Sequence, residues 1–148
     1  MWYLAYRYYE YPYFRYQVFA INKNGAVDSI IVMREVNYNN SKALRIVDFI
    51  GIDDDLAGIG NELRRLIKEK NYEYIDFYEY GIPDNIMISA GFTLKKSDDF
   101  NIIPNYFEPF VLRNIQLNYS TTDESNLYVF KADSDQDRPN SVGCVQNL

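Results

Sequence analysis

Carboxylates and tyrosines are the side chains of this sequence that could carry acid–base chemistry. The chain has no histidine and a single cysteine, Cys144. The sequence therefore argues against histidine-based catalysis, zinc ligation and a disulfide framework. Two carboxylates, Glu35 and Asp48, lie in β-rich stretches. Val47 and Phe49 flank Asp48 with apolar groups, and burial would raise the pKa of its carboxyl group toward the range of a general base.

Tyr78 and Tyr80 lie at the end of another β-rich stretch, and a phenol hydroxyl can act as a general acid. Each assignment has a plainer alternative. Asp48 could form an ion pair with Arg45 or Arg34. With 15 tyrosines in 148 residues, Tyr78 and Tyr80 could equally be half-buried packing residues with hydrated hydroxyl groups.

Three successive antiparallel strands are predicted in the first third of the chain. Residues 16–21 and 26–36 are β-rich and flank the turn residues Asn22 to Gly25, which predicts a hairpin. Residues 43–51 predict the third strand. Strict alternation along it places one set of side chains, Leu44, Ile46 and Asp48, on one face and the other set, Arg45, Val47 and Phe49, on the opposite face.

The hydrophobic period then becomes helical, which predicts a helix from about Asp55 to Lys70 that ends at Asn71. Asp53, Asp54 and Asp55 are expected to cap its first turn. The elements predicted after it are a strand at 74–80, a short helix from Pro83 to Ala90, strands at 92–94, 110–118 and 127–131, the last two as a hairpin, and an irregular polar tail at 132–148.

These elements predict an α/β (α+β) fold with a mixed, mostly antiparallel twisted sheet and two helices. The length of 148 residues indicates one domain, 1–131, followed by the tail. A net charge of −6 without a long basic run argues against nucleic acid as a partner. No apolar stretch is long enough to span a bilayer, and residues 1–16 lack the apolar core of a signal peptide, so we expect a cytoplasmic protein.

The order of strand, loop, helix, strand and short helix, followed by Ala90-Gly91-Phe92, resembles the second half of the GNAT superfamily of acyl-CoA-dependent N-acyltransferases. The resemblance is best from Ile30 to Leu94. A closer similarity, to the C-terminal portions of uncharacterised bacterial acyltransferase-like proteins associated with surface-polysaccharide genes, is carried by three segments, Arg7-Tyr8 with Pro12, residues 47–51 and residues 135–140.

The resemblance implies that strands 44–51 and 74–80 diverge and leave backbone groups free for the pantetheine arm of acetyl-CoA or another acyl-CoA. It also implies catalytic roles for Asp48 or Glu35 as base and for Tyr78 or Tyr80 as acid. The implied cofactor-binding residues are Phe49, Ile50, Gly51, Gly58, Gly60 and Asn85. The glycines would let the start of the helix approach the pyrophosphate.

Two features depart from the family pattern. Asp53, Asp54 and Asp55 lie where a basic or amide residue would help to bind the pyrophosphate, and carboxylates repel a pyrophosphate. The plain alternative is that these residues form an acidic helix cap and that the glycines allow close packing. The family's first strand and first two helices have no counterpart before Tyr16. A homodimer, or a missing N-terminal half, would then have to complete the acceptor side.

Two further segments invite a functional interpretation. Asp133, Asp135 and Asp137 have the spacing of a calcium loop, but Arg138 and Pro139 replace the turn glycine and a ligand, which favours a solvated acidic tail and no metal site. The aromatic residues between Tyr6 and Tyr16 could stack on sugar rings or a partner, or could simply cover the core as a strand edge.

The sequence therefore predicts a GNAT-like acyltransferase, or half-domain of one, that transfers an acyl group, expected to be acetyl, from acyl-CoA to a small-molecule acceptor such as an amino sugar. The alternative is a non-catalytic module of the same fold that serves dimerisation or acceptor recognition. A third class, an interaction protein using its Tyr-rich edge, fits the composition alone.

Overall fold

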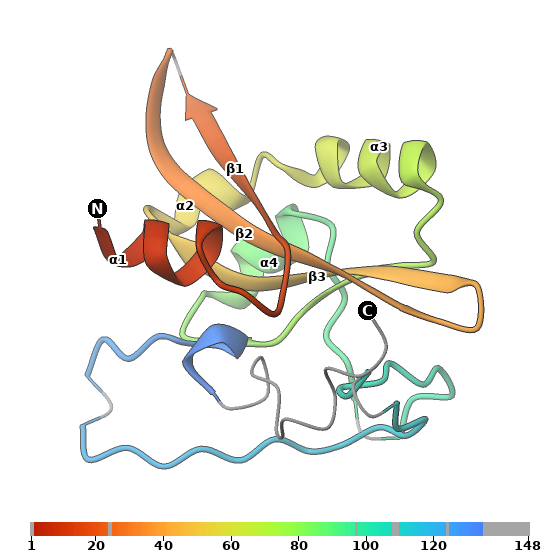
Figure 1. Cartoon of the computed structure of the whole chain (residues 1–148). Helices are drawn as coiled ribbons and strands as arrows, with labels where there is room; N and C mark the ends of the chain where they lie inside the picture. The colour runs from red at the N-terminus through yellow and green to blue at the C-terminus, as the bar shows by residue number, and fades with distance from the viewer. Residues whose placement is uncertain (1, 24, 97, 108–109, 124, 135–148) are drawn as a thin grey trace.

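The computed structural model describes residues 2–134 except 24, 97, 108–109 and 124. Its fold class is α+β, as the sequence predicts (Figure 1). The elements in chain order are α1 (Trp2–Leu4), the π-helical turn η1 (Ala5–Tyr9), β1 (Tyr16–Lys23), β2 (Ala26–Tyr38), β3 (Ser41–Ile50), α2 (Asp53–Leu56), α3 (Gly60–Lys70), β4 (Ile75–Phe77), β5 (Glu79–Tyr80), α4 (Asp84–Ser89), β6 (Val129–Phe130) and the 3-10 turn η2 (Lys131–Asp133).

The main sheet has the strand order β1-β2-β3-β4. The first three strands form the predicted antiparallel meander, and β4 joins β3 in parallel. Asn39 and Asn40 form the tight turn between β2 and β3 with φ of 50° and 68°. Asparagine tolerates this left-handed conformation, which hairpin turns of two residues require.

Two helices, rather than one, follow β3. The chain between Leu56 and Gly60 turns, so the predicted helix is divided into α2 and α3. Ile52 is the N-cap of α2 and no side chain caps it, so the prediction of a carboxylate cap is wrong. The predicted end is confirmed, because Asn71 adopts the left-handed conformation and its N–H bonds to the carbonyl of Ile67.

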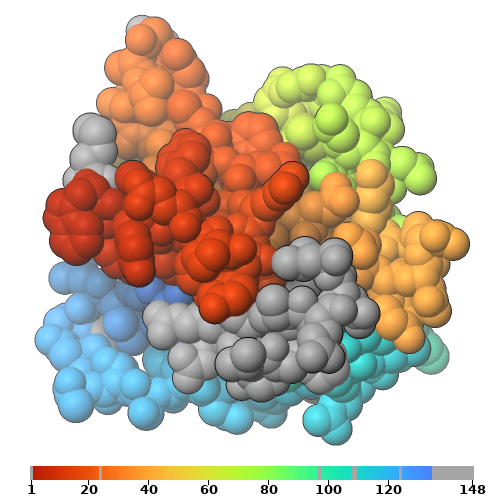
Figure 2. All heavy atoms as spheres, in the orientation of Figure 1, coloured from red at the N-terminus to blue at the C-terminus, as the bar shows by residue number. Residues whose placement is uncertain are grey.

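The aromatic N-terminus forms helical turns that the sequence analysis did not predict. Its density of tyrosine is typical of strands. In α1 and η1, however, Leu4 and Tyr8 are four residues apart, and both pack against the sheet, while Trp2 and Tyr9 stay exposed. The space-filling view shows this segment (red) against the β1–β2 part of the chain (Figure 2).

Several predictions in the second half are wrong. The predicted strand 74–80 is divided at Tyr78, and its second part pairs with β6 in a separate sheet of two strands. Residues 92–94 and 110–118 form no strand, apart from a single bridge between Phe107 and Phe110. The predicted hairpin between 110–118 and 127–131 is therefore absent, since β6 pairs with β5 instead. The short helix after Pro83 is confirmed as α4.

The sheet separates two apolar clusters. The larger lies between the sheet and α2, α3 and α4, and it includes Leu44, Ile46 and Phe49 of β3. The smaller lies on the opposite face, where Val47 packs with Tyr8 of η1 and with Ala132 of η2. No helix in the described part of the chain is long and apolar enough to cross a membrane.

Candidate functional site

A β-bulge in β3 determines how the candidate site is built. Val32 of β2 faces Asp48 and Met33 faces Ile46, so Val47 is an extra residue in β3. A bulge increases the local twist of a strand and re-aims the side chains that follow it. The bulge turns Asp48 toward the face on which Val47 lies, and it turns Phe49 toward the larger core on the opposite face. The assignment of Asp48 and Phe49 to faces by strict alternation is therefore wrong.

The bulge falls where β3 and β4 part. The parallel pairing covers three residue pairs and ends with Ile46 opposite Phe77. Residues 47–50 continue in β3 while the other strand turns away at Tyr78 toward β6. Within the described residues, no backbone hydrogen bond joins 47–50 to anything but β2. The expected divergence of the two strands is therefore present.

Tyr8 is the direct partner of Asp48. Its hydroxyl donates a short hydrogen bond to Oδ2 of Asp48, although the two residues are 40 positions apart in sequence. Burial raises the pKa of the Asp48 carboxyl group to about 6, the Tyr8 bond opposes this rise, and the nearby charge of Asp133 adds to it. Burial and the Asp48 charge in turn raise the pKa of the Tyr8 phenol. Sequence reasoning named Tyr8 only as part of the aromatic N-terminal segment and did not connect it with Asp48.

Arg7 supports this pair from the same turn. It is 7% exposed, and its guanidinium donates to the Tyr16 hydroxyl at 3.0 Å and to the carbonyl oxygen of Ala132 at 3.5 Å. It also lies 5.1 Å from the centre of the Tyr8 ring. Asp48 does not form the ion pair with Arg45 or Arg34 that the plainer interpretation proposed, because Arg45 binds Asp76 and Arg34 lies over the Phe14 ring.

Glu35 lies on the other face of the sheet from Asp48. Its carboxylate accepts a hydrogen bond of 2.8 Å from the Tyr72 hydroxyl and lies 4.0 Å from the Lys42 ammonium. Tyr72 belongs to the larger core, whereas the Asp48 partner Tyr8 belongs to the smaller one. The two carboxylates predicted as alternative bases are thus not brought together.

A buried polar cluster holds Tyr78. Arg45, 1% exposed, donates from Nε and Nη2 to both carboxylate oxygens of Asp76, with 2.6 Å as the shortest distance. The guanidinium also donates to the carbonyl oxygens of Asn105 and Pro104. Tyr78 lies against this cluster, with Arg45 5.5 Å from its ring centre.

The Tyr78 phenol stays protonated at neutral pH. Burial and the Asp76 charge raise its pKa to about 12, although Arg45 opposes them, and its hydroxyl donates to the carbonyl oxygen of Ile103. Lys131, 2% exposed, lies 5.1 Å from the ring and donates to Oδ1 of Asn105. Because Arg45 extends from β3 on the face opposite Leu44 and Ile46, Tyr78 lies on the same side of the sheet as Asp48.

The other predicted site residues are spread over the molecule. Tyr80 is 44% exposed and its ring lies 4.8 Å from that of Tyr119. Asn85 is exposed on α4. Phe49 is buried in the larger core and Ile50 is 40% exposed. The residues the structure places around the diverging strands are therefore Asp48, Tyr8 and Tyr78.

The three glycines have different environments. Gly51 has φ of 149°, and a Cβ there would lie 2.0 Å from Oγ of Ser29. Gly60 begins α3, where a Cβ would lie 2.8 Å from the carbonyl oxygen of Ala90, so it allows α3 to pack closely on the end of α4. Gly58 has no atom within 4 Å of such a Cβ and lies in the turn before α3. Close packing thus accounts for Gly51 and Gly60.

Two of the three successive aspartates are engaged. Asp55 is buried, accepts a hydrogen bond of 2.6 Å from Ser29 and lies 3.3 Å from Nζ of Lys23. The Ser29 bond lowers the pKa of Asp55, and Lys23 assists. Asp53 accepts a hydrogen bond from the Tyr128 hydroxyl at 2.8 Å. Asp54 is exposed. These carboxylates join α2 to the β1–β2 hairpin and to the chain before β6.

The chain's own segment Val129–Asp133 packs against both diverging strands. Phe130 of β6 stacks on Phe77 of β4 with ring centres 5.8 Å apart, and Ala132 of η2 packs on Val47 of β3. The β5–β6 sheet that holds this segment has only two residue pairs. The space beside residues 47–50 is thus filled by a segment with few backbone hydrogen bonds to the rest of the fold.

Two cavities lie away from this segment. A groove of about 510 Å³ runs between β1, β2 and α3 over apolar side chains that include Phe19, Met33 and Leu66. A pocket of about 250 Å³ lies at the β2–β3 turn. The described residues contain no group of His, Cys, Asp and Glu arranged to hold a metal ion, and the calcium-like tail beyond Ser134 lies outside them.

Comparisons with family models, with curated proteins and with solved structures found no match to this chain.

Proposed function

We propose that this chain is a GNAT-like domain that binds acyl-CoA and transfers its acyl group to an amine, such as that of an amino sugar in a bacterial polysaccharide pathway. The observation that carries the proposal is the parallel β3–β4 pair that ends at the Val47 bulge. Residues 47–50 have backbone groups that the ladder with β4 does not use, and the amides of a pantetheine arm could pair with them. An acyl-CoA substrate would imply a cytoplasmic location.

Asp48 is the proposed general base. A carboxyl group with a pKa of about 6 is largely ionised at neutral pH and basic enough to accept the proton that an attacking amine releases. The amine nitrogen forms a bond to the thioester carbon, the carbon–sulfur bond breaks, and the amine proton passes to Asp48, directly or through water. Tyr8 is the proposed positioning residue, since its hydroxyl fixes one carboxylate oxygen.

Tyr78 is the proposed acid that protonates the departing thiolate, and Tyr80 is the alternative from the sequence. Tyr78 is supported by its place on the Asp48 side of the sheet. Its raised pKa of about 12 leaves the proton on the phenol and makes it a weaker acid than a free tyrosine. The pyrophosphate would lie near Gly58 and the first turn of α3. This helix has 11 residues, which is long enough for its N-terminal N–H groups and dipole to attract an anion. Lys23 offsets part of the negative charge of Asp55, and Ser29 and Tyr128 donate hydrogen bonds to Asp55 and Asp53.

Binding requires the segment Val129–Asp133 to leave the space beside residues 47–50. Its two residue pairs with β5 make this movement less costly than opening the main sheet.

The test is a thermal-shift titration with acetyl-CoA, and with adenosine 3′,5′-bisphosphate as the ligand that lacks the pantetheine arm. Acetyl-CoA should raise the melting temperature with saturation, and the bisphosphate should raise it less.

An Asp48→Asn variant separates binding from chemistry. We expect it to keep the acetyl-CoA shift and to lose acyl transfer to a panel of amino sugars, whereas Asp28→Asn, an exposed aspartate on β2, should keep both. The absence of any shift at millimolar acetyl-CoA would reject the acyltransferase proposal.

A second candidate is a non-catalytic module of the same fold that pairs with another copy of itself. The observation that favours it is the outer edge of β1, which pairs with no other strand in the described part of the chain. This edge carries no charged side chain from Tyr16 to Asn22 and borders the groove under α3. Soluble domains usually protect such an edge with charge or proline. The mass measured by light scattering should then be that of a dimer. Ala20→Lys, at an exposed position of β1, should convert the dimer to a monomer. A wild-type protein that is monomeric at about 100 μM would reject this second candidate.

A further inference from the structure

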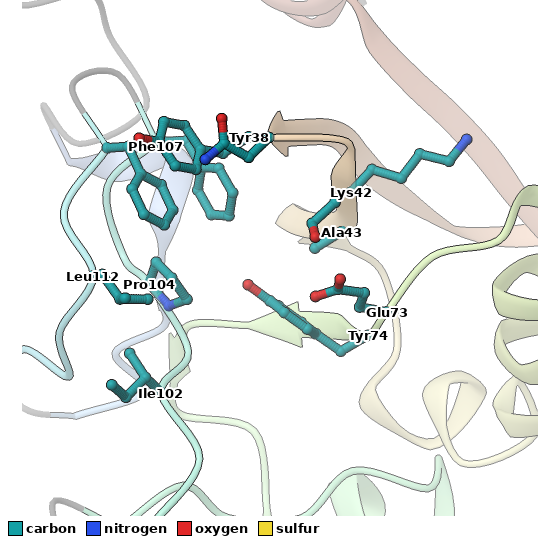
Figure 3. Close-up of a pocket in the computed structure, with 12 residues that line it drawn as sticks. Tyr38, Lys42, Ala43, Glu73, Tyr74, Ile102, Pro104, Phe107 and Leu112 are labelled. Carbon is teal, nitrogen blue, oxygen red and sulfur yellow. The ribbon is translucent and has the colours of Figure 1, made fainter.

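A second small site lies at the other end of β3, at the start of the parallel pair rather than at its divergence. Its walls come from the β2–β3 turn, from the residues just before β4 and from Ile102, Pro104, Phe107, Phe110 and Leu112 (Figure 3). The pocket holds about 250 Å³. Nothing in the acyl-CoA proposal uses it, so its ligand can be argued independently.

Aromatic rings form one side of this pocket. Tyr38 and Phe110 stack face to face with ring centres 3.8 Å apart and an angle of 4°. Phe107 meets Phe110 edge to face at 5.5 Å. Tyr74 lines the opposite side, and Figure 3 shows its hydroxyl directed across the pocket toward Pro104. A ligand here would be bordered by several aromatic rings.

Negative charge at the pocket comes from Glu73. Its backbone is fixed by a hydrogen bond of 2.9 Å to the carbonyl oxygen of Lys42, and its carboxylate lies beside Tyr74 in Figure 3. Glu73 is exposed and Tyr74 is half-buried, and among the described residues neither the Glu73 carboxylate nor the Tyr74 hydroxyl has a hydrogen-bond or ion-pair partner. The pocket thus offers two acceptor groups that the fold itself does not use.

Two positive side chains lie near the pocket, and other groups of the fold already bind both. The Arg45 guanidinium lies 5.3 Å from the centre of the Phe107 ring and donates to the carbonyl oxygen of Pro104, and its charge is paired with Asp76. Lys42 is one of the lining residues, but its ammonium lies 5.2 Å from the centre of the Tyr72 ring and 4.0 Å from the Glu35 carboxylate. Figure 3 shows it extending away from the aromatic walls. Its charge is therefore directed toward the other side of the turn.

We propose that this pocket binds a small organic ammonium ion. Aromatic faces attract a cation electrostatically, and a nearby carboxylate adds to that attraction. The negative charge of Glu73 would repel an anion. A neutral ligand of the same shape would gain binding energy only from apolar contact. The net charge of −6 further favours the approach of cations.

The test uses choline and 3,3-dimethylbutan-1-ol, its uncharged isostere, with binding followed by chemical shifts of the tyrosine rings. Choline should perturb Tyr38 and Tyr74 with saturation, and its affinity should exceed that of the isostere by about tenfold. Ethanolamine, as a primary ammonium, distinguishes a requirement for N–H donors from a requirement for charge alone. Binding of either ammonium ion above the isostere supports the proposal.

Variants assign the effect to the pocket. Glu73→Gln should weaken choline binding about fivefold and leave the isostere unchanged, and Glu10→Gln, at an exposed position outside the pocket, should change neither. Phe110→Leu should weaken both by removing one ring of the stacked pair. If neither ammonium ion binds more tightly than the isostere, or if neither saturates, the proposal is overturned.

Discussion

The Asp48→Asn substitution should stabilise the protein in a pH-dependent way. Burial raises the pKa of Asp48 from 3.8 to about 6, a difference of about 2 pKa units. Because one unit corresponds to about 1.4 kcal/mol, the folded chain holds this proton about 3 kcal/mol more tightly than the unfolded chain does. The wild type has this stabilisation fully below about pH 4 and loses it as the pH rises through about 6.

An asparagine at position 48 does not ionise, yet its side-chain carbonyl can still accept the hydrogen bond from Tyr8. The variant and the wild type should therefore have similar free energies of unfolding near pH 4. The variant should be more stable by up to about 3 kcal/mol at pH 7.5.

The assay is urea unfolding of both proteins between pH 4 and pH 8, with Asp28→Asn as the control for loss of one carboxylate. Tyr8→Phe provides a second check, because its hydroxyl opposes the rise of the Asp48 pKa. Without that hydroxyl, the pH at which stability is lost should move upward. A difference between wild type and Asp48→Asn that does not vary with pH would refute the argument that Asp48 is held in a site unfavourable to its charge.

Two further predictions concern packing. Asp76→Asn leaves the buried Arg45 guanidinium without its carboxylate and should lower the free energy of unfolding by about 3 to 5 kcal/mol in urea titrations; a loss below about 1 kcal/mol would contradict the buried pairing. Gly60→Ala places a Cβ 2.8 Å from the Ala90 backbone and should lower the free energy of unfolding by about 1 to 3 kcal/mol. Gly58→Ala meets no atom within 4 Å and should be neutral or slightly stabilising. Similar calorimetric melting temperatures for the two variants would count against the observed α3–α4 contact.

Local sequence signals determined the β1–β2–β3 meander, the end of α3 and the short helix α4. The turn residues between β1 and β2, the apolar period of α3 and the stop at Asn71 all act between residues close in the chain, so they could be predicted. Proline before and glycine after α4 belong to the same kind of signal. Asp48 could be recognised as a candidate because its neighbours are apolar.

Only the tertiary structure decided how the candidate site is assembled. The bulge at Val47 changes the face of Asp48, but it arises from the twist and pairing of β3 with β2 and β4 and leaves no pattern in the β3 sequence. Tyr8 reaches Asp48, and Phe130 pairs with Glu79, although the two residues of each pair are 40 or more positions apart in the sequence. Such contacts depend on which distant segments pack together, because a local propensity for strand or helix carries no information about the partner.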